Sequence, residues 1–192
     1  YYQDRAHLDA PALRQRIAEY CDQNGWQGEV VHEETGLLPV ITGGDFAGYR
    51  ASLERDGVAL AGARGGFVHP LTSYTVPIAV RNALAIAAAV GRMDGAQLAD
   101  FLAARAREHW RATGYYRLLG KMLFDAAEPQ ERYRIFERFY TLPEPLIERF
   151  YAAQSSPLDK LRILSGKPPV PVRRAVAALL GKGAPLVQGD NS

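Results

Sequence analysis

The sequence predicts an α+β chain whose C-terminal half is predominantly helical, and three observations support this. Apolar residues recur at helical spacing from Gln97 onward. Two short stretches with β character, residues 27–32 and 36–42, precede that half. A glycine cluster at residues 62–66 stands between a short apolar run and a long helical pattern. A length of 192 residues, 47% of them hydrophobic, is ordinary for a soluble globular chain of one or two domains.

The first elements have local signals for where they begin and end. Residues 11–24 predict an amphipathic helix, with Asp9 as its N-cap and Gly25 as its stop. Residues 27–32 predict a strand and residues 36–42 its hairpin partner. Residues 43–45 predict a turn. Residues 46–56, which follow this turn, are ambiguous between helix and strand.

A strand, a glycine-rich loop and a helix are expected next. Residues 58–61 read as the strand and residues 76–90 as the helix, and further helices begin near Pro143 and Pro157. A lone strand cannot form a sheet, so its partner strands are expected upstream. The start at Tyr1 rather than Met agrees with a piece of a longer protein.

Composition excludes several classes of function. A net charge of +2 gives no indication of nucleic-acid binding. The single cysteine, Cys21, excludes an internal disulfide and a metal site of several thiolates, and it is expected to be a small core residue in a reducing, cytoplasmic compartment. No run reaches the roughly 18 apolar residues that a membrane span needs.

The glycine-rich loop carries the clearest functional signal. Residues 62–77 place a glycine cluster, a proline and several hydroxyl residues directly before a helix. A helix N-terminus has unpaired N–H groups and a partial positive charge. We therefore expect this loop to hold an anion or the electron-rich edge of a cofactor.

This loop resembles a segment of known flavoproteins. Residues 62–76 are similar to the second flavin-contacting segment of the glutathione-reductase-like flavoproteins, the branch that contains geranylgeranyl reductases and aromatic hydroxylases. That segment usually reads Gly-Asp-Ala-Ala-Gly. Here Ala63 and Arg64 replace Asp-Ala, and Ser73 and Thr75 stand where glycines are usual.

Three further stretches resemble the bacterial lycopene beta-cyclases. Residues 67–77 (Phe-Val-His-Pro-Leu-Thr-Ser-Tyr-Thr-Val-Pro) are similar to their Phe-His-Pro-Thr-Thr-Gly-Tyr-Ser-Leu-Pro segment, with one extra Val. Residues 33–40 (Glu-Glu-Thr-Gly-Leu-Leu-Pro-Val) resemble their second acidic motif. Residues 138–152 and 159–171 match their long C-terminal signature almost throughout.

The resemblance implies a partial glutathione-reductase-like FAD/NAD(P)-binding fold that lacks its N-terminal Rossmann half. That half, and a Glu-Asp-Thr segment with the main catalytic acid, would lie upstream. The implied division is residues 1–57 in the substrate-binding domain, 58–92 as the last strand-loop-helix of the FAD-binding domain, 93–180 as a helical region and 181–192 as a flexible tail.

The resemblance also implies the reaction and its catalytic residues. The family converts the linear ψ-ends of lycopene into β-rings by acid/base chemistry, with reduced FAD that is not consumed and NAD(P)H as reductant. The implied catalytic residues are Glu33, Glu34 and His69. Strand alternation would turn one glutamate inward and one outward. His69 would act near the flavin as a proton acceptor or hydrogen-bond donor, or else satisfy a loop carbonyl.

The implied cofactor-binding residues are Gly62, Arg64, Gly65, Gly66, Pro70, Thr72, Ser73 and Tyr74. Tyr74 would stack on the polyene or flavin, or cap the helix, and Arg64 would contact a phosphate or form a salt bridge. An aromatic stripe reads first as helix core and second as the lining of a carotenoid tunnel; it comprises Tyr133, Phe136, Tyr140 and Phe150. No metal is implied.

The implied partner is a linear carotenoid end, drawn from the membrane by peripheral contact on the cytoplasmic side of a bacterium. Residues 118–124 would either dip into the membrane interface or pack as ordinary helix. Two alternatives remain open at this point: a related flavoprotein isoprenoid reductase, and a non-enzymatic module that binds carotenoid or membrane.

Overall fold

A computed structural model describes residues 8–165 of the chain. The chain divides into two compact units, and of the described residues 8–38 belong to the first and 39–165 to the second. Each unit is treated by itself. The predicted tail at residues 181–192 lies outside the described residues.

The first unit is built on helix α1, Ala10–Gln23. The carboxylate of Asp9 accepts a hydrogen bond from the Ala12 amide at 3.0 Å, and the chain leaves the helix through Gly25 at φ +67°. The predicted helix, N-cap and stop are therefore confirmed. No residue of α1 is buried, so Cys21, which is half-buried, is not the core residue that the sequence predicted.

The predicted strands are wrong, because the described part of the chain contains only helices, turns and extended segments without a β-ladder. Residues 27–32 and 58–61 have no neighbouring strand to complete their hydrogen bonds, and Val31 is 93% exposed. Residues 36–42 do not form a hairpin. Instead the Ile41 amide donates to the Pro70 carbonyl at 2.8 Å, which lays this segment against the predicted cofactor loop.

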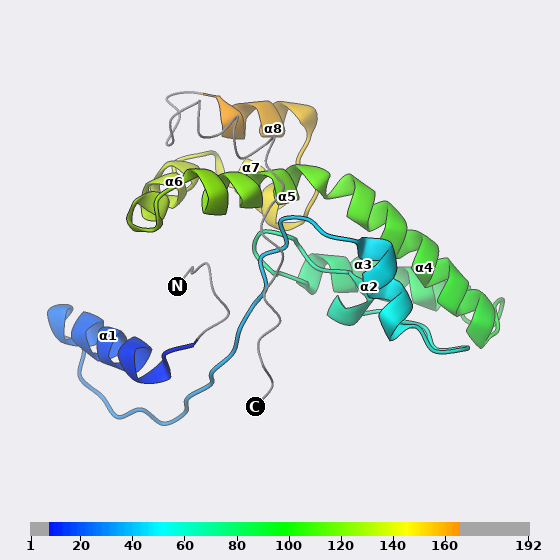
Figure 1. The fold of residues 1–192 in the computed structure, drawn as a ribbon, viewed down its shortest axis with the longest axis horizontal. Coiled ribbons are helices and arrows are strands. Elements are labelled where there is room, and N and C mark those ends of the chain that lie inside the picture. The colour runs from blue at the N-terminus through cyan, green and yellow to red at the C-terminus, as the bar shows by residue number, and fades with distance from the viewer. Residues whose placement is uncertain (1–7, 166–192) are drawn as a thin grey trace. The chain divides into compact units, whose positions relative to one another are not determined.

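The second unit is helical, as the sequence predicted for its larger part. It also contains two 3₁₀ turns, at Ala63–Gly65 and Pro129–Glu131, and a π-helical turn at Met122–Ala126. Figure 1 shows α5 continuing the line of α4. The helices are α2 Phe46–Leu53, α3 Val76–Ala89, α4 Gly95–Ala112, α5 Gly114–Lys121, α6 Arg132–Phe139, α7 Glu144–Tyr151 and α8 Pro157–Leu164.

The helix starts follow from capping residues. Asp94 and Gln97 form a reciprocal capping box at α4, and Ser156 and Asp159 form one at α8. Proline stands in the first turn of α3, α7 and α8, where its missing N–H costs nothing. The helices predicted near Pro143 and Pro157 are confirmed as α7 and α8.

The π-helical turn after α5 is held by a buried arginine. Arg132 donates from Nε to the Leu123 carbonyl at 3.0 Å and from its Nη2 to the Phe124 carbonyl at 3.2 Å. Its guanidinium also lies 4.6 Å from the centre of the Phe124 ring. The wide turn leaves carbonyls without their usual helical donors, and Arg132 supplies them.

The predicted cofactor loop connects two apolar clusters of the core. Phe67 packs in a cluster formed with α3 and α4, whose buried members are Phe67, Ile78, Leu102 and Ala106. Leu71 packs in a second cluster formed with α5 and α7, whose buried members are Leu71, Tyr116, Leu123 and Phe150. The five residues from 67 to 71 therefore anchor the loop on both sides.

Candidate functional site

Gly65 and Gly66 are required by close packing on the inner side of the loop. A β-carbon added at Gly65 would lie 2.4 Å from the Leu60 carbonyl oxygen. Gly66 has φ +88°, and a β-carbon there would lie 2.5 Å from the Phe46 ring. That ring stacks on Trp110 with 4.7 Å between ring centres. Both glycines therefore face protein, and their role here is to admit neighbouring atoms.

Arg50 on α2 fastens this inner side of the loop. Arg50 is 6% exposed, and its Nη1 donates to the Gly65 carbonyl at 3.0 Å. Its Nη2 reaches Glu54 at 3.4 Å. No pattern in the sequence predicts this contact, because α2 lies in the stretch that was ambiguous between helix and strand.

Several backbone N–H groups of the loop donate hydrogen bonds to carbonyls within the loop itself. The amides of Gly65 and Gly66 donate to the carbonyls of Gly62 and Ala63 at 2.8 and 2.9 Å. At the start of α3, the amides of Ile78 and Ala79 both donate to the Thr75 carbonyl. The expected row of open N–H groups is therefore much reduced, since a turn satisfies its own donors when no ligand does.

His69 is the most deeply buried polar residue of the loop, with an exposed fraction of 0%. Its Nε2 lies 3.0 Å from the Phe150 carbonyl oxygen, and its Nδ1 accepts hydrogen bonds from the amides of Leu71 and Thr72, each at 3.3 Å. An acceptor at Nδ1 and a donor at Nε2 define the neutral Nε2–H tautomer. His69 thus ties the loop to the end of α7.

Burial sets the charge state of His69. Loss of solvation lowers the pKa of the ring to about 4, and the hydrogen bond to Phe150 offsets only part of this. The ring is therefore neutral at pH 7. His109 on α4 is similar: its Nε2 lies 2.9 Å from the Val68 carbonyl, and burial lowers its pKa. Two neutral histidines hold adjacent residues of the same loop.

Aromatic rings surround His69 on the side of α5 and α7. Tyr116 lies 4.4 Å and Phe150 lies 5.2 Å from the imidazole, measured between ring centres. Phe139 lies 4.7 Å from Phe150. Of the aromatic stripe, Phe150 is buried core, whereas Tyr133 and Tyr140 are each more than half exposed. Phe136 packs against the second core cluster, so the core interpretation holds for Phe136 and Phe150, and the carotenoid-tunnel interpretation of the stripe stays a prediction.

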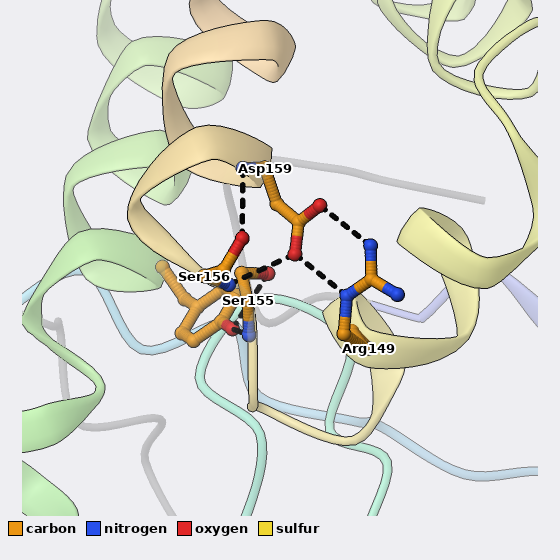
Figure 2. A network of polar contacts seen from close by, with 5 residues as sticks. Arg149, Ser155, Ser156 and Asp159 are labelled. Atoms are coloured by element: carbon orange, nitrogen blue, oxygen red, sulfur yellow. Dashed lines mark hydrogen bonds and ion pairs between the residues drawn. The ribbon is translucent and has the colours of Figure 1, made fainter.

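A polar network behind these rings fixes α7 and α8 (Figure 2). Arg149 donates to both carboxylate oxygens of Asp159 at 2.7 Å, and the Ser156 amide donates to the same carboxylate at 2.9 Å. These bonds hold the pKa of Asp159 well below its usual range. The Tyr116 hydroxyl donates to Ser155 at 2.9 Å and accepts from its amide at 3.0 Å. Tyr116 thus joins this network to His69.

The exposed edge of the loop is formed by other predicted cofactor residues. Gly62 has open space where a β-carbon would stand, and Arg64 is exposed with no hydrogen bond or ion pair to any described residue. Thr72 accepts from the Tyr74 amide at 3.3 Å, and Tyr74 is 42% exposed with its ring edge-on to Tyr151. These positions offer donors and an aromatic face to a ligand.

Pro70 and Ser73 connect the loop to the segment at residues 39–42. Pro70 is buried and its carbonyl accepts from Ile41. Ser73 donates its hydroxyl to the Pro39 carbonyl and has φ +56°, a left-handed conformation that costs energy in a residue with a side chain. The sequence similarity had placed Ser73 where the family has glycine, and the positive φ explains why glycine suits that position.

Glu33 and Glu34 lie in the first unit and both are exposed. Glu33 pairs with Arg14 of α1, with the closest contact at 2.6 Å, and this guanidinium lowers the pKa of the carboxyl group. Glu34 lies 3.3 Å from His32. Because residues 27–34 do not form a strand, the expected alternation of one inward and one outward glutamate is not observed.

The region that was considered for membrane contact packs within the protein. Leu123 is buried, and Leu119 and Phe124 pack against the second core cluster. Within residues 8–165, no helix combines the length and apolarity that crossing a membrane requires. The same residues contain no group of three or more His, Cys, Asp or Glu side chains placed to hold a metal ion.

Comparison with known proteins identifies the family. The model of the lycopene cyclase protein family matches residues 1–177. The chain belongs to the lycopene cyclase family. No solved structure matches it.

Three curated lycopene beta-cyclases are similar to this chain over nearly all of its length. The identity is 43% over 180 residues with the protein of Pseudescherichia vulneris, 40% over 184 residues with that of Pantoea ananas, and 39% over 178 residues with that of a Paracoccus species. These alignments cover 93%, 94% and 93% of the chain, and 46% of each relative. The chain therefore spans about half the length of the curated relatives that it matches.

Sequence reasoning missed the residues that hold the loop in place. Arg50, His109 and Tyr116 contact the loop, Asp159 binds Arg149 of α7, and none of the four was among the predicted site residues. Only Asp159 could have been found from the sequence, because Ser156 and Asp159 have the spacing of a capping box. The other contacts depend on tertiary packing.

Proposed function

We propose that the protein to which this chain belongs is a flavin-dependent lycopene beta-cyclase. It would convert the linear ψ-ends of lycopene into β-rings, through γ-carotene to β-carotene, without net redox change. The observation that supports this most strongly is 39–43% identity to three lycopene beta-cyclases over more than nine-tenths of the chain. At that level of similarity over such a length, a shared reaction is the simplest explanation.

Reduced FAD is the proposed cofactor, with NAD(P)H as its reductant, and the exposed edge of the loop suits it. Gly62 leaves room for a planar group, and Arg64 has a positive charge without a partner among the described residues. Thr72 and Tyr74 add a hydroxyl and a ring. When bound, anionic reduced flavin would supply a negative charge that stabilises a carbocation. Gly65, Gly66 and Pro70 would contribute by shaping the loop, and Ser73 by orienting it.

We assign His69 to positioning. A ring that is neutral, fully buried and bonded through both nitrogens holds the loop on α7 without changing its charge near pH 7. A part in proton transfer would first require the bond to Phe150 or those to the amides of Leu71 and Thr72 to break. The hydrogen bonds of the two ring nitrogens therefore explain why this position of the loop holds a histidine.

The two glutamates are proposed to differ in role. Glu33 forms an ion pair with Arg14 that favours its ionised form, which makes it a poor proton donor. Glu34 is 87% exposed at its side chain and has only a contact with His32. We therefore assign Glu34 as the glutamate that handles a proton once the substrate and the rest of the protein enclose it. An enclosed carboxyl group retains its proton to higher pH.

The substrate is very apolar, so the protein is proposed to work at the cytoplasmic face of the membrane by peripheral contact. Water must be excluded while the cation exists, since capture by water would give an alcohol. The ordered aromatic cluster of Tyr116, Phe139 and Phe150 supports a rigid apolar wall in this half of the protein.

The test is to express the full-length protein in a host that accumulates lycopene and to analyse the carotenoids by absorption and mass. Ring formation gives an isomer of unchanged mass with a shorter effective conjugation. The purified protein should require flavin and reductant for this conversion. Lycopene that stays unchanged beside folded, flavin-loaded protein would refute the cyclase assignment. Hydrogenated isoprenoid products would indicate a reductase, and carotenoid binding without turnover would indicate a non-enzymatic module.

A further inference from the structure

Three arginines and a histidine gather where helices α3, α4 and α5 meet. Arg81 lies on α3, Arg105 and His109 lie one turn apart on α4, and Arg117 lies on α5. All three arginines are half-buried. We name these four residues the basic cluster.

Hydrogen bonds and a ring contact connect the three helices at the basic cluster. Nε and Nη2 of Arg105 donate to Oδ1 of Asn82 at 3.4 and 3.3 Å, and Asn82 follows Arg81 on α3. Arg117 donates from Nη1 to the carbonyl of Trp110, in the last turn of α4, at 2.6 Å. Its guanidinium lies 3.7 Å from the centre of the Trp110 ring. The arginines of α3 and α5 are therefore both held against α4.

In the part of the chain that the structure describes, no carboxylate forms an ion pair with an arginine of the basic cluster. Burial and the positive charge of Arg105 lower the pKa of Arg81. Burial also lowers the pKa of His109, and the positive charges of Arg81 and Arg117 lower it further. Charges that are partly buried in proteins are usually paired. The guanidiniums here repel one another instead.

The guanidiniums of the basic cluster also retain unused hydrogen-bond donors. Arg81 donates from Nη2 to the Ala152 carbonyl at 2.9 Å, and its Nε and Nη1 bond to no described residue. Arg117 bonds through Nη1 alone, to the Trp110 carbonyl and to the Thr113 hydroxyl at 3.1 Å. Within residues 8–165, none of these unused nitrogens is closed off from solvent. A ligand arriving from solvent can therefore accept several hydrogen bonds at once.

We propose that the basic cluster binds a phosphate group of a ligand other than the proposed flavin. Planar guanidiniums match the oxygens of a phosphate through paired hydrogen bonds. The oxygens of a carboxylate lie in one plane, whereas those of a phosphate point in several directions and can accept from three helices together. A bound phosphate would also offset the repulsion among the three arginines. The ends of lycopene are apolar, so the inference goes beyond the proposed reaction and does not rest on it.

The basic cluster is attached to the buried side of the candidate loop. His109 bonds to the carbonyl of Val68, which is 8% exposed, whereas the proposed flavin contacts lie at the exposed edge of the loop. Arg81 bonds to Ala152 at the end of α7, the helix to which the loop is also tied through His69. A phosphate among the guanidiniums would therefore stabilise both attachments of the loop.

Titration of the full-length protein with inorganic phosphate tests the inference. Binding is measured by calorimetry with and without added FAD, and sodium chloride keeps the ionic strength constant. The variants are Arg81→Gln and Arg105→Gln. Arg107→Gln is the matched control, because Arg107 is an exposed arginine of the same helix as Arg105. Unfolding curves without phosphate show that each variant is folded, and Arg105→Gln breaks only a side-chain contact with Asn82.

We expect saturable binding to the wild-type protein, weakened at least about tenfold in Arg81→Gln and Arg105→Gln and unchanged in Arg107→Gln. Absence of saturable binding would overturn the inference. Equal weakening in the control would overturn it as well, because it would show only a general attraction of anions. Binding that added FAD abolishes would assign the cluster to the phosphates of the flavin, with the same consequence.

Vesicles of phosphatidylglycerol distinguish the two sources of a phosphate group. If vesicle binding weakens in Arg81→Gln and Arg105→Gln but not in Arg107→Gln, in step with phosphate binding, the ligand is a phospholipid headgroup. If phosphate binding alone weakens, the ligand is a soluble phosphate compound. Either result supports a phosphate site at the basic cluster.

Discussion

Residues 33–34 and residues 69–72 both belong to segments that resemble family motifs, and the protein holds them in opposite ways. The glutamates are exposed and charged and pair with exposed partners. His69 is fully buried and neutral, and both ring nitrogens bond to the backbone. A change at the glutamates should therefore affect chemistry with little effect on folding, whereas a change at His69 should affect folding first.

The largest effect on stability is expected for His69→Ala. The variant leaves the Phe150 carbonyl and two amides without their partner and opens a cavity between Tyr116 and Phe150. We expect a loss of about 3 kcal/mol in the free energy of unfolding of the full-length protein. Denaturant titration measures it. His32→Ala, at an exposed histidine, is the control and should change little; equal effects of the two variants would contradict the comparison.

Acid should lower the free energy of unfolding of the wild-type protein through the imidazole of His69. The pKa of His69 is about 4 when folded and 6.5 ordinarily, so the unfolded chain binds more protons between these values. Stability is therefore full above pH 6.5 and falls as pH decreases toward 4, by on the order of 3 kcal/mol in total. His109 acts in the same direction. Unfolding curves at pH 7, 5.5 and 4 measure this, and His69→Gln should flatten the dependence. A slope that the variant leaves unchanged would assign the pH effect to other groups.

Two ion pairs give the next comparison. Asp159 is 5% exposed beneath Arg149, whereas Glu33 and Arg14 are both largely exposed. We expect Asp159→Asn to lower the thermal midpoint at pH 7 and Glu33→Gln to leave it nearly unchanged, because exposed pairs are screened by water. The stabilisation from Asp159 should be lost as pH falls below its unfolded pKa of about 3.9, since its folded pKa is depressed. A midpoint that falls equally for both variants would refute this distinction.

The smallest effect on stability, together with a large effect on turnover, is expected for Glu34→Gln. If Glu34 handles a proton, lycopene conversion by the full-length enzyme should fall by about 100-fold or more while the unfolding curve is unchanged. Glu33→Gln should retain most activity. Carotenoid analysis over time, normalised to bound flavin, measures both. Full activity in Glu34→Gln would remove this residue from the mechanism.

Local signals in the sequence were sufficient for most of the helices. Asp9, Asp94 and Ser156 cap helices as their spacing indicates, and prolines mark the starts of α7 and α8. The strands at 27–32, 36–42 and 58–61 failed because β-structure depends on a neighbour that local pattern cannot supply. Val30 and Val31 have strand propensity, yet they lie exposed in an extended segment.

The sequence indicated a candidate loop but not its geometry. The sequence singled out the turn at residues 69–74, and the structure shows it as an anchored, ordered feature between two core clusters. That His69 faces Phe150, 81 positions later, follows only from how α7 packs. The use of Gly65 and Gly66 to admit Leu60 and Phe46 was likewise invisible, because glycines for packing and glycines for ligands look alike in sequence.

The π-helical turn at Met122–Ala126 has a consequence for insertions and deletions. Such a turn contains one residue more than an α-helical turn would, and each residue of a helix corresponds to about 100° of rotation. Deleting a single residue there would convert the segment to regular α-helix and swing the chain that follows around the axis. Phe150 would then no longer present its carbonyl to the imidazole, although no amino acid near the imidazole had been altered. The length of this stretch, more than its composition, sets the phase of helices α6, α7 and α8.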